Sequence, residues 1–124
     1  MELIHFSKLV AEKAKKQANR AAVFYRDYSL AKWVEITWRE LNEKVERVAR
    51  ALASLGVKEE DRVAICSQNM PQALIVDFAN YANRAISVPM YATASVQQIE
   101  YIVNDAEIEL LCVGEQVSKN ELVP

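Results

Sequence analysis

The sequence has 124 residues, of which 52% are hydrophobic and 26% are charged, and its formal net charge at pH 7 is -2. This length and composition are those of one globular domain and exclude a disordered chain. The weak net charge excludes a general electrostatic attraction to nucleic acid or to an anionic membrane surface.

The sequence predicts a cytoplasmic protein without a transmembrane segment. No run approaches the ~18 apolar residues of a membrane span, and the N-terminus lacks the apolar core of a signal peptide. Cys66 and Cys112 each lie in an apolar segment without a Cys-x-x-Cys motif, which predicts reduced, buried thiols. The lone histidine, His5, has no Cys, Asp or second His at ligand spacing, so we expect a helix-surface or packing residue and no metal site.

The N-terminal part predicts a helix followed by a β-hairpin. Apolar residues recur at intervals of three to four over residues 2–18, which is typical of an amphipathic helix. Residues 22–26 and 32–36 are expected to form two short strands joined by a turn. Trp33 and Trp38 flank the exit of this hairpin, and we expect them to pack as core or rim anchors.

Thr37 also opens the clearest helix of the chain. Thr37 and Glu40 have the spacing of a capping box, and Gly56 can take the left-handed conformation that ends a helix. Val57 just beyond it can supply the accompanying hydrophobic contact. The apolar face between these ends comprises Leu41, Val45, Val48, Ala49, Leu52 and Leu55.

A second, more apolar helix is expected over residues 73–81, with Asn69 as its cap and Pro71 in its first turn. Because this helix is apolar nearly all round, we expect other elements to cover more than one of its sides. Asp77 is its one formal charge, and Arg84 lies two turns further on. A charge in such surroundings needs a partner, so we predict a structural Asp77–Arg84 pair, or a partner in a region missing from this sequence, in preference to a catalytic acid.

Three buried strands are predicted at residues 62–67, 86–90 and 108–113, with helices between them, the last capped by a Ser95–Gln98 capping box. Strands and helices that alternate with short links are typical of a parallel sheet. The predicted fold class is therefore α/β: a three-layer parallel βαβαβ unit preceded by an N-terminal helix and a short β-hairpin.

We expect residues 1–124 to form a single α/β segment, because no internal boundary, repeat or low-complexity segment is visible. The sequence stops a few residues after its last strand without a closing element, which predicts a cut through a larger domain. The alternative is a self-standing βαβ interaction or dimerisation module without catalysis.

Ligands of parallel sheets gather at the carboxyl ends of the strands. These ends are residues 67–69, 91–93 and 114–116. For the polar residues there we favour structural roles, with Asn69 capping a helix and Tyr91 and Thr93 fixing the turn after the second strand. A small enzyme without ATP that works near Tyr91 is a further reading, which would require a ligand bound there.

Catalytic and cofactor motifs are absent from the sequence. Gly56 and Gly114 are its only glycines, so no glycine-rich loop can surround a phosphate with backbone N–H groups. It also has no Gly-x-Ser-x-Gly, His-Glu-x-x-His or Cys/His cluster. We therefore predict no catalytic, cofactor-binding or metal-binding residue in this chain.

Residues 61–93, with the flanking segments from about residue 25 to residue 115, resemble adenylate-forming (AMP-binding) enzymes, and within them the long-chain fatty acid CoA ligases. The residues that match the family pattern are Ile36, Thr37, Trp38, Glu40, Leu41, Ala51, Leu52, Leu55, Gly56, Val57, Asp61–Ile65, Asn69, Pro71, Val88, Pro89, Tyr91, Ala92, Thr93, Val96, Ile99, Tyr101, Ile102 and Asp105. The chain departs from the pattern at Arg84, where many relatives have glycine, and at Gln72 and Ala73, where an acidic residue and a tryptophan are common.

The resemblance implies the partial N-terminal domain of an acyl-CoA synthetase-like fold. It implies a parent enzyme that uses ATP and Mg²⁺ to form an acyl-adenylate and then transfers the acyl group to coenzyme A. The family's catalytic residues and its Ser/Thr/Gly-rich ATP loop with a lysine map beyond Pro124. We therefore expect the chain alone to be inactive, to have the remainder of the enzyme as its partner and to self-associate in isolation.

Overall fold

The computed structural model describes residues 5–114 of the chain, which form four helices and five strands in two sheets. In chain order the elements are α1 (Phe6–Gln17), β1 (Ala21–Asp27), β2 (Lys32–Thr37), α2 (Trp38–Ser54), β3 (Arg62–Cys66), α3 (Pro71–Ala82), β4 (Ile86–Met90), α4 (Val96–Asp105) and β5 (Leu110–Val113).

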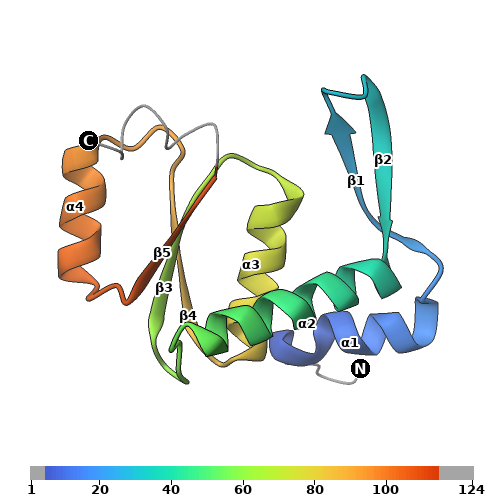
Figure 1. Cartoon of the computed structure of the whole chain (residues 1–124), viewed down its shortest axis with the longest axis horizontal. Coiled ribbons are helices and arrows are strands. Elements are labelled where there is room, and N and C mark those ends of the chain that lie inside the picture. Colours follow the sequence, from blue (N-terminus) through green and yellow to red (C-terminus); the bar gives the residue numbers. More distant parts are fainter. Residues whose placement is uncertain (1–4, 115–124) are drawn as a thin grey trace.

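Strand β3 is the centre of a parallel sheet, with β4 on one side of it and β5 on the other. Figure 1 shows α4 against one face of this sheet and α2 and α3 on the other. Val63, Ala64 and Cys66 of β3 are fully buried because both faces of the strand are covered. The predicted three-layer parallel βαβαβ unit is confirmed.

Successive residues of β3 belong to two different hydrophobic clusters. Val63 packs with Leu52 of α2 and Ala79 of α3, whereas Ala64 packs with Ile99 of α4. Side chains of a strand alternate between the faces of its sheet, so one short strand supplies both clusters. This explains why β3 reads as a continuous apolar run in the sequence.

Helix α2 begins and ends as predicted. The Thr37 hydroxyl accepts a hydrogen bond from the Glu40 N–H at 3.2 Å, and the Glu40 carboxylate accepts one from the Thr37 N–H at 3.1 Å. Gly56 follows the helix with a φ of 102°, in the region that glycine adopts without steric cost. The Val57 N–H then donates to the Leu52 carbonyl, and the Val57 side chain is buried.

A third hydrophobic cluster joins α1, the hairpin, α2 and α3. Its buried members are Val10, Ile36, Leu41, Val45 and Ile75. Helix α3 therefore contacts α1 and α2 as well as the sheet, which confirms that it is covered on more than one side.

The start of α1 gives His5 a specific role. Its Nδ1 accepts a hydrogen bond from the Ser7 N–H at 3.2 Å, so His5 caps the helix. The side chain is exposed, as predicted for a surface histidine. The predicted helix over residues 2–18 is shorter in the structure, and residues 2–4 lie outside the described residues.

The hairpin is confirmed, but one of its tryptophans lies elsewhere than predicted. Strands β1 and β2 pair antiparallel, and Asp27 in the turn accepts hydrogen bonds from the backbone N–H groups of Ser29 and Leu30. Trp38 is half-buried against the third cluster. Trp33 is 67% exposed, so its prediction as a core or rim anchor is wrong within the described part of the chain.

Two predicted element ends need correction. Met70, and not Asn69, is the N-cap of α3, and it makes no side-chain capping bond. Pro71 occupies the first turn, as predicted. The last strand begins at Leu110, two residues later than predicted.

Helices long and apolar enough to cross a bilayer do not occur among residues 5–114.

Candidate functional site

The carboxyl ends of the parallel strands lie together at one edge of the sheet, as the sequence predicts. The Gly114 N–H, just after β5, donates a hydrogen bond to the Cys66 carbonyl at the end of β3, at 2.8 Å. The Cys66 thiol lies 3.9 Å from the Tyr91 carbonyl, which follows β4. Backbone and thiol contacts thus link all three strand ends.

Gly114 and Ser67 leave little space between the ends of β3 and β5. A Cβ atom added at Gly114 would lie 2.5 Å from Ser67 Oγ, so only glycine fits this approach. The Ser67 hydroxyl donates to the Gln68 carbonyl at 2.8 Å. The remaining candidates at this strand end, Glu115 and Gln116, lie outside the described residues.

The other polar candidates at this edge are exposed and do not converge. Tyr91 is 85% exposed, and Asn69 and Thr93 are exposed as well. The turn after β4 is closed by the Ala94 N–H, which donates to the Tyr91 carbonyl at 3.0 Å. The backbone therefore fixes this turn. The side chains of Tyr91 and Thr93, which were predicted to fix it, make no hydrogen bond within residues 5–114.

A hollow of about 570 Å³ lies between the end of β4 and helix α4. Its wall is formed by Pro89, Met90, Tyr91, Tyr101 and Ile102, together with small and amide side chains of the Ala94–Gln98 segment. Among these described residues the reactive groups are the hydroxyls of Tyr91, Ser95 and Tyr101, and no imidazole, carboxylate or amine lines the hollow to activate them.

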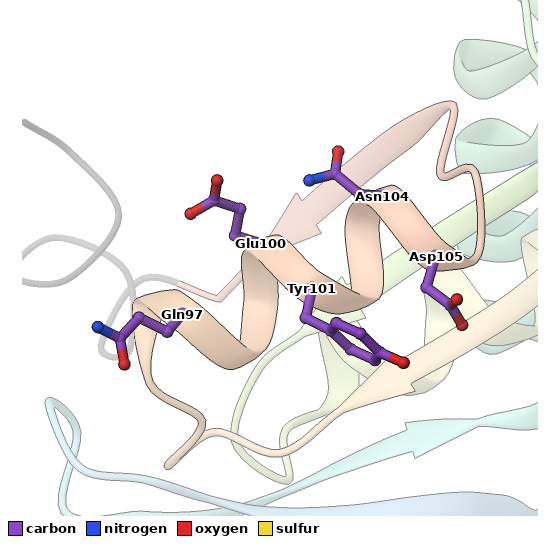
Figure 2. Close-up of a pocket in the computed structure, with 5 residues that line it drawn as sticks. All are labelled: Gln97, Glu100, Tyr101, Asn104 and Asp105. Carbon is purple, nitrogen blue, oxygen red and sulfur yellow. The ribbon is translucent and has the colours of Figure 1, made fainter.

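The surface of α4 shown in Figure 2 is lined by residues of that helix alone, which are Gln97, Glu100, Tyr101, Asn104 and Asp105. The side chains fan out from the helix: Gln97 and Asp105 point toward opposite ends, and Tyr101 points away from Glu100 and Asn104. Functional groups that diverge in this way cannot hold one small ligand from several directions.

A hollow of about 620 Å³ separates the hairpin from the start of α3. Phe24, Tyr28 and Trp33 line one wall, and Met70 and Leu74 belong to the other. The side chains named on both walls are mainly aromatic and apolar, and such a surface suits packing rather than proton transfer.

Asp77 is held by a serine and not by the predicted arginine. The Ser87 hydroxyl on β4 donates to Asp77 Oδ1 at 2.5 Å, and it accepts a hydrogen bond from Asn80 Nδ2 at 3.2 Å. Arg84 is exposed, with a φ of 57°, and makes no ion pair among residues 5–114. The predicted Asp77–Arg84 pair is wrong, because the chain turns sharply after α3 and brings β4 alongside it instead.

The sequence reasoning overlooked Ser87, although strand periodicity offered a signal. Ser87 is the one polar residue in an otherwise apolar strand, at a position where its side chain faces helix α3. Asn80 is fully buried, and its Oδ1 has no hydrogen-bond partner in the described structure. These three side chains form a structural network inside the domain.

Burial sets the titration of two further groups. Burial raises the pKa of the Tyr81 hydroxyl, and the Asp77 carboxylate adds to this rise. Burial also raises the pKa of the Cys112 thiol. A thiol with a raised pKa holds little nucleophilic thiolate at neutral pH, so Cys112 lacks the character of a catalytic nucleophile.

The described residues supply neither a metal site nor a phosphate loop. Among residues 5–114, no group of three or more His, Cys, Asp or Glu side chains is arranged to hold a metal ion. Gly56 ends α2, and Gly114 lies against Ser67. Neither glycine of residues 5–114 thus lies in a loop that could surround a phosphate with backbone N–H groups.

Known proteins resemble this chain in both sequence and fold. The family described as AMP-binding enzyme matches residues 10–124. The long-chain-fatty-acid–CoA ligase FadD15 of Mycobacterium bovis is 37% identical over 79 residues, which are 64% of this chain and 13% of that protein. Fatty acyl-CoA synthetase A of Dictyostelium discoideum is 36% identical over 89 residues, which are 71% of this chain and 13% of that protein.

A solved structure agrees closely with the fold. The N-terminal domain of FACL13 from Mycobacterium tuberculosis, crystallised with an inhibitor, superimposes with a TM-score of 0.84. The superposition covers 95% of this chain and 28% of that one, at 20% identity.

The chain spans 13% of the length of the two curated relatives described above. The family match nevertheless extends without a break over most of the sequence, from the first helix onward. The chain therefore belongs to the AMP-binding enzyme family.

Proposed function

We propose that this chain is the N-terminal α/β segment of an acyl-CoA ligase. The whole enzyme would activate a fatty acid with ATP and Mg²⁺ to an acyl-adenylate and transfer the acyl group to coenzyme A. The observation that carries this proposal is the family match over residues 10–124. In this account residues 1–124 act as one structural unit, whose partner is the remainder of the ligase.

Long-chain fatty acids are the substrates we favour. The two curated relatives compared above are named as a long-chain-fatty-acid–CoA ligase and a fatty acyl-CoA synthetase. Both have a higher percentage identity over their aligned residues than bacitracin synthase 2 of Bacillus licheniformis, which is 30% identical over 112 residues, 90% of this chain and 4% of that protein. We also place the enzyme in the cytoplasm, which the two free cysteines, Cys66 and Cys112, support.

In isolation the chain is expected to catalyse neither half-reaction. Two well-separated glycines cannot form the phosphate loop of this family. The strand ends, where ligands of α/β sheets gather, hold a tight Gly114–Ser67 contact and exposed, unconnected polar side chains. The role that remains for this segment is to build and stabilise the large domain.

The reading frame of the gene beyond codon 124 tests this proposal. We expect it to encode a Ser/Thr/Gly-rich segment that ends in lysine, as adenylate-forming enzymes require for ATP. A stop codon directly after Pro124 would contradict the proposal and favour the alternative, a self-standing βαβ interaction module.

A further inference from the structure

The two outer strands of the parallel sheet differ in the backbone groups that they present to their open edges. Within residues 5–114, β4 and β5 each pair on one side only, with β3 between them. The N–H and C=O groups of one residue in a strand face the same side, and those of the next residue face the other side. One printed hydrogen bond in each strand therefore determines which residues face the open edge.

The open edge of β4 is interrupted by a proline. The Ile86 N–H donates to the Asp61 carbonyl at 2.7 Å, so Ile86 and every second residue after it face β3. Ser87 and Pro89 alternate with these residues and face the open edge. Proline has no N–H, and within sheets it is found almost only on edge strands. Pro89 therefore indicates that β4 is also an edge of the complete sheet.

The open edge of β5 has no such interruption. The Gly114 N–H, which directly follows β5, donates to the Cys66 carbonyl at 2.8 Å. By the same alternation, Leu111 and Val113 present their N–H and C=O groups to the open edge. Proteins protect exposed edges with proline, charged side chains or β-bulges, and the four residues of β5 include neither proline nor a charged residue.

The side chains of β5 are incompletely covered on both faces of the sheet. Leu110 and Cys112 pack against the cluster formed with α2 and α3, whereas Leu111 packs against the cluster formed with α4. All three are half-buried, but Val63 and Ala64 of the central strand are fully buried. A strand that is buried on both faces of a parallel sheet is normally apolar. The missing neighbour of β5 is thus expected to be an apolar strand.

We propose that β5 pairs along this edge with an apolar strand from the remainder of the ligase, and that β4 stays an edge. The inference rests on the proposed function, because that strand lies beyond this chain, which spans 13% of each of the two curated relatives. A covalently linked strand also has a far higher effective concentration at the edge than a second copy in dilute solution.

Amide hydrogen exchange at single residues tests the proposal. It compares the 124-residue chain, in dilute solution, with the longer protein read from its gene. The N–H groups of Leu111 and Val113 should exchange at least about tenfold more slowly in the longer protein, because they become hydrogen-bonded there. The Ser87 N–H should exchange at the same rate in both. Equal rates at Leu111 and Val113, or slower exchange at Ser87, would overturn the proposal.

Val113→Pro removes one donor from the β5 edge, and Val113→Ala is the matched control that keeps it. In the longer protein the Leu111 N–H should exchange about tenfold faster in the proline variant than in the alanine variant. In the 124-residue chain the two variants should exchange alike at Leu111. Circular dichroism verifies that both are folded, and the wild-type comparison is independent of them. Equal exchange in the longer protein would contradict pairing at Val113.

Exchange of pyrophosphate into ATP by the longer protein separates this inference from the proposed function. Slower amide exchange at Leu111 and Val113 without pyrophosphate exchange would contradict the proposed function and support the strand pairing. Pyrophosphate exchange without slower amide exchange would overturn the strand pairing alone.

Discussion

The hydroxyl of Ser87 on β4 donates a hydrogen bond to Asp77 Oδ1 on α3, 2.5 Å away, and so ties the helix to the sheet. Ser87→Ala would remove this donor and also the acceptor for Asn80 Nδ2. Two partly or fully buried polar groups would then lack a partner, which typically costs about 1–3 kcal/mol. Urea denaturation of both proteins measures this loss as a fall in the free energy of unfolding.

Ser54→Ala is the matched control for that experiment. The Ser54 hydroxyl donates to the Ala51 carbonyl at 2.7 Å, but on an exposed helix surface where water can replace it. We expect a change within about 0.5 kcal/mol. Equal effects of the two substitutions would mean that the Ser87 network does not stabilise the domain.

Arg84 occupies a backbone conformation that suits glycine. Its φ is 57°, a left-handed value that costs a non-glycine residue about 1–2 kcal/mol. Because glycine also loses more conformational entropy on folding, Arg84→Gly should raise the free energy of unfolding by about 0.5–1 kcal/mol. Arg84→Ala keeps the strain and removes the same exposed side chain, so it should leave stability nearly unchanged. A gain for alanine equal to that for glycine would assign the effect to the side chain.

The Thr37–Glu40 capping box should stabilise α2 in a pH-dependent way. Thr37→Ala removes the acceptor for the Glu40 N–H and should cost about 1 kcal/mol. Hydrogen bonds from Thr37 hold the pKa of Glu40 below its ordinary value of 4.5. The Glu40 carboxylate therefore contributes to stability fully above about pH 4.5, and this contribution is lost as the pH falls through the lowered pKa. Thermal unfolding from pH 7 to pH 3 should show a smaller difference between wild type and Thr37→Ala at the acid end.

The two thiols should react slowly with a thiol reagent until denaturant is added. Cys66 is fully buried and Cys112 is half-buried, so Cys66 should be the slower of the two. Burial raises the pKa of the Cys112 thiol above its ordinary value of 9.0. The neutral thiol therefore contributes to the stability of the folded state below pH 9. This contribution is lost as the pH rises through the raised pKa. Labelling of single-cysteine variants at pH 8 measures both rates, and rapid labelling of Cys66 in the native state would contradict its burial in β3.

Local signals in the sequence predicted the helix ends well, with one instructive exception. The capping boxes at Thr37 and Ser95 depend on residues three positions apart, so the sequence alone contains them. Asn69 looked like the cap of α3, but Pro71 is the first helical residue and makes Met70 the N-cap. Asn69 then lies one residue too early to reach the orphan N–H groups.

Tertiary contacts account for what the sequence could not predict. The partner of Asp77 depends on how α3 packs against β4, and only the folded chain brings Ser87 to it. The hairpin carries large apolar residues on both faces, with Tyr25 on one and Trp33 on the other. Alternation shows that these residues face opposite ways, but only packing decides which of them is covered.

The most direct test of the central claim is the exchange of pyrophosphate into ATP that depends on a carboxylic acid. It should be measured with short, medium and long fatty acids, for the 124-residue chain alone and for the longer protein read from its gene. The account predicts a rate equal to the blank for the chain alone and exchange with long-chain acids for the longer protein. Exchange by the chain alone, or its absence from the longer protein with every acid, would contradict it.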